Sequence, residues 1–144
     1  MSADRLAAAG PGAWRIRLRT ILGAVVATLA VRVLALTAFD IPAEFEPLAT
    51  TGPTLFLTVV GVVAGLVVAV GVDRWSARPV PLFRRIALAA LLLSLLPDFW
   101  LLTASGREAF AGATVPAVVT LMLQHVAAAA VVILVAGRAV PRAS

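Results

Sequence analysis

Cysteine and lysine are both absent from this chain of 144 residues, and histidine occurs once. Without cysteine the protein has no disulfide chemistry, no thiol nucleophile and no thiolate to ligate a metal. A single histidine means that one chain cannot supply the two axial imidazoles of a b-type haem. These absences exclude several enzyme and electron-transfer classes, and we expect neither a metal nor a cofactor.

Charge is scarce as well: charged residues make up 13% of the chain and hydrophobic residues 62%. Soluble domains average about 25% charged and roughly 45–50% apolar residues. A soluble core of this size cannot hide so much apolar surface, so the composition favours a protein dissolved in lipid. All 12 basic residues are arginine, and with the abundance of Ala, Val, Gly and Leu this indicates a bacterium with a GC-rich genome.

Long apolar stretches dominate the chain. An apolar helix of about 20 residues spans the roughly 30 Å of hydrocarbon in a bilayer, and lipid leaves no water for open backbone groups, so these stretches should be helices. We predict an all-α, four-helix transmembrane bundle over residues 14–138, with a disordered tail at 1–13 and a second tail at 139–144. The four predicted helices cover about 20–39, 54–72, 86–102 and 115–136.

The arginines predict the orientation of the bundle. Four precede the first helix, four lie between the second and third helices, and two follow the fourth. The loops on the opposite side hold Arg107 and four carboxylates. The positive-inside rule therefore places both termini in the cytoplasm of a multi-pass plasma membrane protein. The net charge of +5 then indicates contact with anionic lipid headgroups rather than with nucleic acid.

One alternative concerns the first helix, because arginines before an apolar run also resemble a secretory signal peptide. Against this, the apolar stretch is about as long as a full span and Arg32 interrupts its second half. A cleavage-like Val33-Leu34-Ala35 follows that arginine directly. Cleavage there would leave three helices in the same orientation.

Aromatic residues fall at the ends of the predicted spans, where membrane proteins carry aromatic belts. Most of them flank the loops rather than the centres of the helices. We therefore expect Phe83 at the inner interface and Phe45 at the outer one.

Small residues indicate where the helices pack. Without a hydrophobic force between helices in lipid, association needs close contact between backbones. Thr54, Thr58, Gly61 and Gly65 share one ridge of the second helix, and the two glycines form a GxxxG motif. We expect this ridge to pack within the bundle, with a homodimer seam as the alternative.

Three ionisable residues lie inside the predicted spans: Arg32, Asp98 and His125. Such residues are costly in lipid and normally face the bundle interior with partners. From the helix rise, Arg32 lies about 10 Å and Asp98 about 6 Å from the outer end, and His125 about 15 Å deep. Because arginine matches a carboxylate, we predict an Arg32–Asp98 pair with His125 a turn or two deeper.

This cluster has three readings. In the first, the pair neutralises two inserted charges and fixes the register of the first and third helices. In the second, Asp98 titrates in a proton-linked site, with Arg32 as counter-ion and His125 as relay. In the third, Arg32 extends outward to lipid phosphates and Asp98 stays alone.

Proline interrupts the third helix immediately before the aspartate. Pro97 lacks a backbone donor and clashes with the carbonyl of Leu93, which predicts a kink. Ser94 lies four residues before Asp98 and shares its face. We expect Ser94, Asp98, Arg32 and His125 to form one polar pocket that opens toward the outer side, with Gln124 as a further candidate.

Several motifs resemble a family of small bacterial four-helix membrane proteins of unknown function. They are Phe45-Glu-Pro-Leu48, Arg78-Pro79 with Phe83, Leu91-Leu-Leu-Ser-Leu-Leu-Pro-Asp98, and Met122-Leu-Gln-His125-Val-Ala-Ala. The resemblance covers most of residues 15–138, and its most specific parts are Ser94…Pro97-Asp98 and His125. It implies the same four-helix topology and no activity that can be transferred.

The expected role is a non-enzymatic scaffold or accessory subunit, because no nucleophile, metal or cofactor constellation accompanies Asp98 and His125. The alternative is a small oligomeric transporter or proton-linked permeation protein that uses these two residues. The expected partners are the lipid bilayer and either further copies of the chain or another membrane protein, with no nucleic acid.

Overall fold

The computed structural model describes residues 11–137, and within this range it contains helices and connecting turns without any strand. This confirms the predicted all-α bundle. Its elements are α2 (Pro11–Ala38), α3 (Glu46–Ala49), α4 (Thr51–Trp75), α5 (Pro79–Leu101), α6 (Ala104–Ala109), α7 (Val115–Val131) and a closing π-helix η1 (Val132–Ala136). The predicted tail at 139–144 and residues 1–10 of the first predicted tail lie outside the described residues.

Four segments are long and apolar enough to cross a membrane: Trp14–Ala38, Thr51–Trp75, Pro79–Leu101 and Val115–Ala136. The first three of these helices start earlier than the predicted spans do. Helix α2 begins at Pro11, inside the segment predicted as a tail, and α5 begins at Pro79 rather than near 86. The reason is that hydropathy marks the hydrocarbon span, whereas arginine is a good helix former and proline suits a first turn, so helical hydrogen bonding continues beyond that span.

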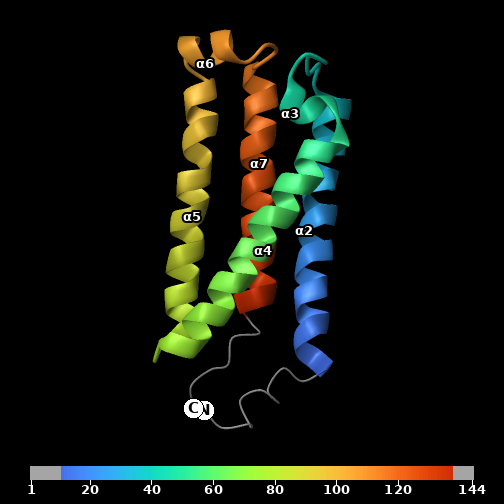
Figure 1. The fold of residues 1–144 in the computed structure, drawn as a ribbon. Coiled ribbons are helices and arrows are strands. Elements are labelled where there is room, and N and C mark those ends of the chain that lie inside the picture. The colour runs from blue at the N-terminus through green and yellow to red at the C-terminus, as the bar shows by residue number, and fades with distance from the viewer. Residues whose placement is uncertain (1–10, 138–144) are drawn as a thin grey trace.

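The four long helices form an open bundle rather than a symmetric square (Figure 1). Helix α7 has α2 on one side and α5 on the other, and both of these also contact α4. Helix α4 runs diagonally across the bundle, from α2 and α3 at one end to the start of α5 at the other (Figure 1). This crossing brings α4 close to α2 over part of its length and leaves it apart from α5 near α6.

Small residues form a closed seam between α2, α4 and α7. Thr20, Ala24 and Thr28 recur every four residues on α2 and are at most 1% exposed. A Cβ on Gly23 would lie only 3.3 Å from Cγ1 of Val131, so this glycine admits α7 at close range. Such contact between small residues is how helices associate in lipid.

Threonine hydroxyls inside the closed seam are hydrogen-bonded. Thr28 donates to the carbonyl of Ala24 at 3.0 Å, and Thr20 donates to that of Ile16 at 2.8 Å. Thr58 of α4 donates to the hydroxyl of Thr28 at 3.2 Å, which joins the two helices. The three threonine hydroxyls of the seam therefore all make hydrogen bonds, as polar groups in a low-dielectric interior must.

Two apolar clusters fill the ends of the bundle. The cluster near the start of α5 includes Phe83, which is 1% exposed, and the cluster near α6 includes Phe45 at 0% and Leu48 at 2%. Both rings therefore pack inside the bundle rather than on its lipid-facing surface, whereas their depth at the two interfaces stays a prediction. The link before α4 folds back as α3 and inserts its apolar side chains between the helices, an arrangement that hydropathy along the chain does not encode.

Glycine permits the tight turns at the α6 end. A Cβ on Gly106 would clash with the carbonyl oxygen of Trp100 and would lie 2.7 Å from Cα of Leu101. Gly112 has a φ of 73°, a left-handed conformation that suits glycine, and the backbone nitrogen of Phe45 lies 2.9 Å from where its Cβ would be. These two positions let α6 fold over the end of α5 and the chain return into α7.

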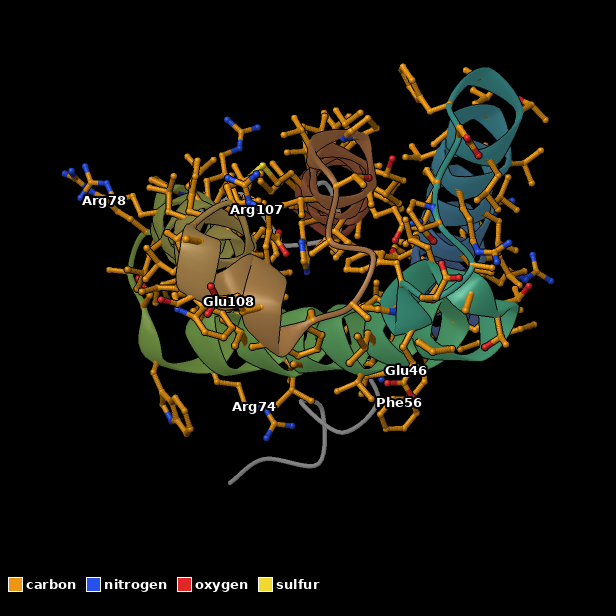
Figure 2. The ribbon with its side chains drawn as sticks, turned by 90° about the horizontal axis from the view of Figure 1, so that it is seen from above. Glu46, Phe56, Arg74, Arg78, Arg107 and Glu108 are labelled. Atoms are coloured by element: carbon orange, nitrogen blue, oxygen red, sulfur yellow. The ribbon has the colours of Figure 1, made fainter. Side chains whose placement is uncertain are left out.

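Charges separate between the two ends of the bundle. The start of α2, the end of α4 and the start of α5 lie at one end and carry seven exposed arginines, which are Arg15, Arg17, Arg19, Arg74, Arg78, Arg84 and Arg85. Figure 2 looks down the bundle from the other end, where α6 carries Arg107 and Glu108 and α3 carries Glu46. The fold thus gathers arginines that are distant in sequence at the end from which both described termini leave.

Candidate functional site

Asp98 and His125 meet in the bundle interior. Nδ1 of His125 lies 2.9 Å from Oδ2 of Asp98, and the side chains are 39% and 5% exposed, respectively. Asp98 comes from the last turn of α5 and His125 from the middle of α7, the helix beside it. With an ionised carboxylate, the Nδ1–H tautomer donates this bond and leaves Nε2 for a second partner. The histidine thus supplies the partner that a buried carboxylate requires.

Arg32 takes a different partner from the one predicted. Its Nη2 donates to the carbonyl oxygen of Leu48 at 2.7 Å, and within residues 11–137 it makes no ion pair with Asp98. Leu48 lies in the last turn of α3, where carbonyls lack helical donors and a cation is favourable. The predicted Arg32–Asp98 pair is therefore wrong: the two residues have similar depths, but α2 packs on α7 and α4 while Asp98 is on α5.

Ser94 and Pro97 lie near Asp98 without bonding to it. The Ser94 hydroxyl donates to the carbonyl of Leu91 at 2.7 Å, within its own helix. Helix α5 continues through Pro97 to Leu101, and Pro97 supplies no donor for the carbonyl of Leu93. The kink at Pro97 remains a prediction. Ser94 is hydrogen-bonded and contributes polarity rather than a free nucleophile.

A groove of about 620 Å³ opens between α4 and α5, with α7 as its floor. We call this feature the groove throughout. Most of its lining is apolar, and it extends from Phe110 at the α6 end to Phe83 at the other. Its polar members are Thr54, Thr58, Ser94, Asp98, Gln124 and His125. Of the four residues predicted to form one polar pocket, Ser94, Asp98 and His125 line the groove and Arg32 does not.

The two glycines of the GxxxG motif line the groove, but their surroundings differ. A Cβ on Gly65 would lie 3.1 Å from Cγ1 of Val132 in η1, so Gly65 packs within the bundle as predicted. A Cβ on Gly61 would meet nothing within 4 Å among the described residues, and Gly61 is exposed on the groove rim. On the predicted packing ridge, Gly65 is thus packed against η1, whereas Gly61 faces open space.

Two further groove residues carry unpartnered polar groups: Gln124, which the sequence offered as a further pocket candidate, and Thr54, which it assigned to helix packing alone. Thr54 is 5% exposed and Gln124 8% exposed, and among the described residues Oγ1 of Thr54 and Nε2 of Gln124 have no hydrogen-bond partner. The signal in the sequence was weak: Thr54 belonged to a ridge of small residues, and Gln124 was the neighbour of His125. Their unpartnered state depends on which helices stand opposite them.

The residues of the groove do not form a metal site. Within residues 11–137 no group of three or more His, Asp or Glu side chains comes together to hold an ion. The groove is thus an apolar surface whose hydrogen-bonding groups are concentrated in the half nearest α6. Such a surface suits binding of an amphiphilic molecule more than activation of water or of a nucleophile.

Comparison with known proteins gives the family of the chain. The model of a family of unknown function (DUF6069) matches residues 8–142, nearly the whole sequence. No curated protein and no solved structure matches the chain. The matched region contains all four long helices and the Asp98–His125 contact. The chain therefore belongs to DUF6069, a family whose function is unknown.

Proposed function

We propose that this protein is a non-enzymatic accessory protein of the membrane that holds a lipid-like molecule in the groove between α4 and α5. The observation that carries the proposal is the groove itself, about 620 Å³ of mostly apolar space with a polar half near α6. Ligand sites are concave, mainly apolar, and contain a few placed polar groups. In a bilayer, a groove of this kind is accessible to molecules that already reside in the hydrocarbon.

The hydrogen bonds around Asp98 support binding over catalysis. Ser94 carries a hydroxyl on the same helix face as Asp98, and this hydroxyl donates its hydrogen bond to the carbonyl of Leu91. A serine nucleophile would instead donate to a base such as His125, whose Nδ1 is 2.9 Å from Asp98. The role we infer is therefore to hold a molecule rather than to transform it.

The test uses two neighbouring alanines of α5. Ala90 lines the groove whereas Ala89 does not, and both are exposed. Native mass spectrometry of protein extracted in a mild detergent should show a retained lipid-like adduct on the wild type and on Ala89→Phe. Ala90→Phe should lose it, because the ring occupies the groove. Equal retention in both variants would reject the proposal, and the mass of a second chain in its place would indicate a scaffold or an oligomer seam.

We also propose that the protein lies in the plasma membrane with both termini cytoplasmic. The support is the arginine-rich end of the bundle, from which both termini leave. Because the chain has no cysteine, single cysteines can be placed at the exposed Ser105 and Ala77 without background. A membrane-impermeant maleimide added to intact cells should label Ser105→Cys and spare Ala77→Cys. The reverse pattern would invert the topology.

Proton-linked transport of the bound molecule is a second candidate, favoured by the contact between Asp98 and His125. Carboxylates and histidines inside membrane helices mark many proton paths. In liposomes with a trapped pH-sensitive dye, the wild type should then acidify the lumen under an imposed pH gradient and Asp98→Asn should not. Absence of proton flux through the wild type would remove this candidate and leave the binding role intact.

A further inference from the structure

Two residues that line the groove each carry a buried polar atom without a hydrogen-bond partner among residues 11–137. These atoms are Nε2 of Gln124 on α7 and Oγ1 of Thr54 on α4. Both residues are more than nine-tenths buried, and both line the groove in its half nearest α6. Buried polar groups in folded proteins are nearly always hydrogen-bonded, and an unmade bond costs free energy. The exceptions therefore suggest that a bound group completes them.

The chemistry of these two atoms selects a hydrogen-bond acceptor. A carboxamide nitrogen only donates, and a threonine hydroxyl donates as readily as it accepts. An oxygen with free lone pairs, as in a hydroxyl or a carbonyl, satisfies such donors. An alkane tail without a head group would leave both of them unpaired.

The charges around the groove select a neutral head group. Among the described residues of its lining there is no arginine, and the carboxylate of Asp98 is paired with His125 at 2.9 Å. An anionic head group would approach this carboxylate without a guanidinium to offset the repulsion. A cationic head group would have to compete with His125 for Asp98. A neutral head group is neither repelled by Asp98 nor required to compete with His125.

The length of the groove selects a long chain. Its lining runs from Pro53 to Val68 on α4 and from Phe83 to Leu101 on α5. At 1.5 Å per residue these segments are about 22 Å and 27 Å long. The polar residues lie in the half near α6, and the remainder of the lining, toward Phe83 and Val132, is apolar.

We propose that the groove binds a neutral long-chain amphiphile whose hydroxyl or carbonyl oxygen accepts hydrogen bonds from Gln124 and Thr54 once these two covered side chains turn toward it, with its chain extending toward Phe83. This inference rests on the proposed binding function and adds the class of ligand and its direction. It assigns Gln124 and Thr54 as the residues that recognise the head group. His125 can take a further bond from a ligand hydroxyl through Nε2.

The experiment exploits the composition of the chain. Gln124 is its single carboxamide side chain, since the sequence has one glutamine and no asparagine. The side-chain NH₂ pair in a ¹⁵N–¹H spectrum therefore belongs to Gln124 alone. The full chain in detergent micelles is titrated with hexadecanol and, separately, with hexadecane, hexadecanoate and hexadecylamine. The backbone amides of Gly61 and Gly65 report occupancy of the groove, and the NH₂ pair reports contact with the head group.

Hexadecanol should shift the resonances of the Gln124 NH₂ pair and of both glycine amides, and these shifts should follow the same saturation curve. Hexadecane should shift the glycines and leave the NH₂ pair in place, and the two charged probes should bind about tenfold more weakly than the alcohol. Gln124→Leu should lower hexadecanol affinity about tenfold, to that of hexadecane, while the ligand-free protein unfolds at a higher temperature. Thr54→Val should act in the same direction.

The outcomes distinguish binding in the groove from recognition of the head group. If hexadecanol and hexadecane shift the glycines equally and the Gln124 pair never moves, the head-group assignment is wrong and groove binding stands. If hexadecanoate or hexadecylamine binds more tightly than hexadecanol, the neutral class is overturned. If no probe moves Gly61 or Gly65, both the ligand class and the proposed function fail together.

Discussion

Helix α4 belongs to two unlike regions: the closed seam with α2 and α7, and the groove toward α5. In the closed seam, Thr58 is hydrogen-bonded to Thr28 and small residues let the backbones approach. In the groove, Thr54 and Gln124 are buried without partners and Gly61 faces open space. The seam therefore has the close packing and satisfied hydrogen bonds of a protein interior, whereas the groove contains open space and two buried polar groups without partners. This difference is the physical basis for assigning structure to one region and binding to the other.

Gly65→Leu should cause the largest loss of stability, because it places a large side chain in a closely packed position. Its Cβ would lie 3.1 Å from Cγ1 of Val132, and overpacking of this kind costs about 3 kcal/mol. The matched variant Gly61→Leu, one turn away, meets nothing within 4 Å among the described residues and should cost less than about 1 kcal/mol. Unfolding in detergent measures both, and equal losses would erase the distinction between the closely packed position of Gly65 and the open position of Gly61.

Breaking the Asp98–His125 pair should have the next largest effect. His125→Leu leaves a carboxylate that is 5% exposed without its partner, at a cost of about 2 kcal/mol. Because His125 is 39% exposed, we expect this rather than the larger penalty of a fully buried ion pair. The double variant with Asp98→Leu should recover part of the loss, with a coupling of about 1–2 kcal/mol.

The control for this cycle is the pair Arg32→Met with Asp98→Leu. Among the described residues Arg32 bonds to Leu48 and Asp98 to His125, so the effects of the two changes on unfolding should add within about 0.5 kcal/mol. A coupling as large as that between Asp98 and His125 would contradict the geometry described above and restore the pair expected from sequence.

Arg32→Met alone should cost about 1.5 kcal/mol, since it removes a charged donor from the carbonyl of Leu48 while keeping the apolar stem. The loss should concentrate at the α6 end, where Leu48 belongs to the apolar cluster. Hydrogen exchange of the amides around α3 would detect this local opening. Unchanged protection there, with loss spread evenly over the bundle, would argue against a local anchor.

Thr58→Val should give the smallest effect, about 0.6 kcal/mol, which is typical of one hydrogen bond between membrane helices. The substitution removes the 3.2 Å bond to Thr28 and keeps the shape of the side chain. Thr28→Val combined with it should add little more, because each single change already breaks the same bond. Thermal unfolding of the four proteins in one detergent tests this, and fully additive losses would contradict it.

Several features of the site were predictable because they depend on residue type and depth. Asp98 and His125 were expected in the interior, since charge and imidazole avoid lipid, and they do lie together. The partner of Arg32 was not predictable from depth, because α2 and α5 lie on different sides of α7. The packing of Phe45 inside the bundle was not predictable, since nothing local shows that α3 folds its side chain into the core.

The sequence by itself determined the number of spanning helices, their positions to within several residues, and the separation of arginines from acidic loops. These properties follow from hydropathy and charge, which act residue by residue against lipid and water. Only the tertiary structure decided that Asp98 pairs with His125, that Gly65 is closed and Gly61 open, and that a groove separates α4 from α5. Those outcomes depend on the rotation and tilt of each helix, and these are set by contacts among all four helices together.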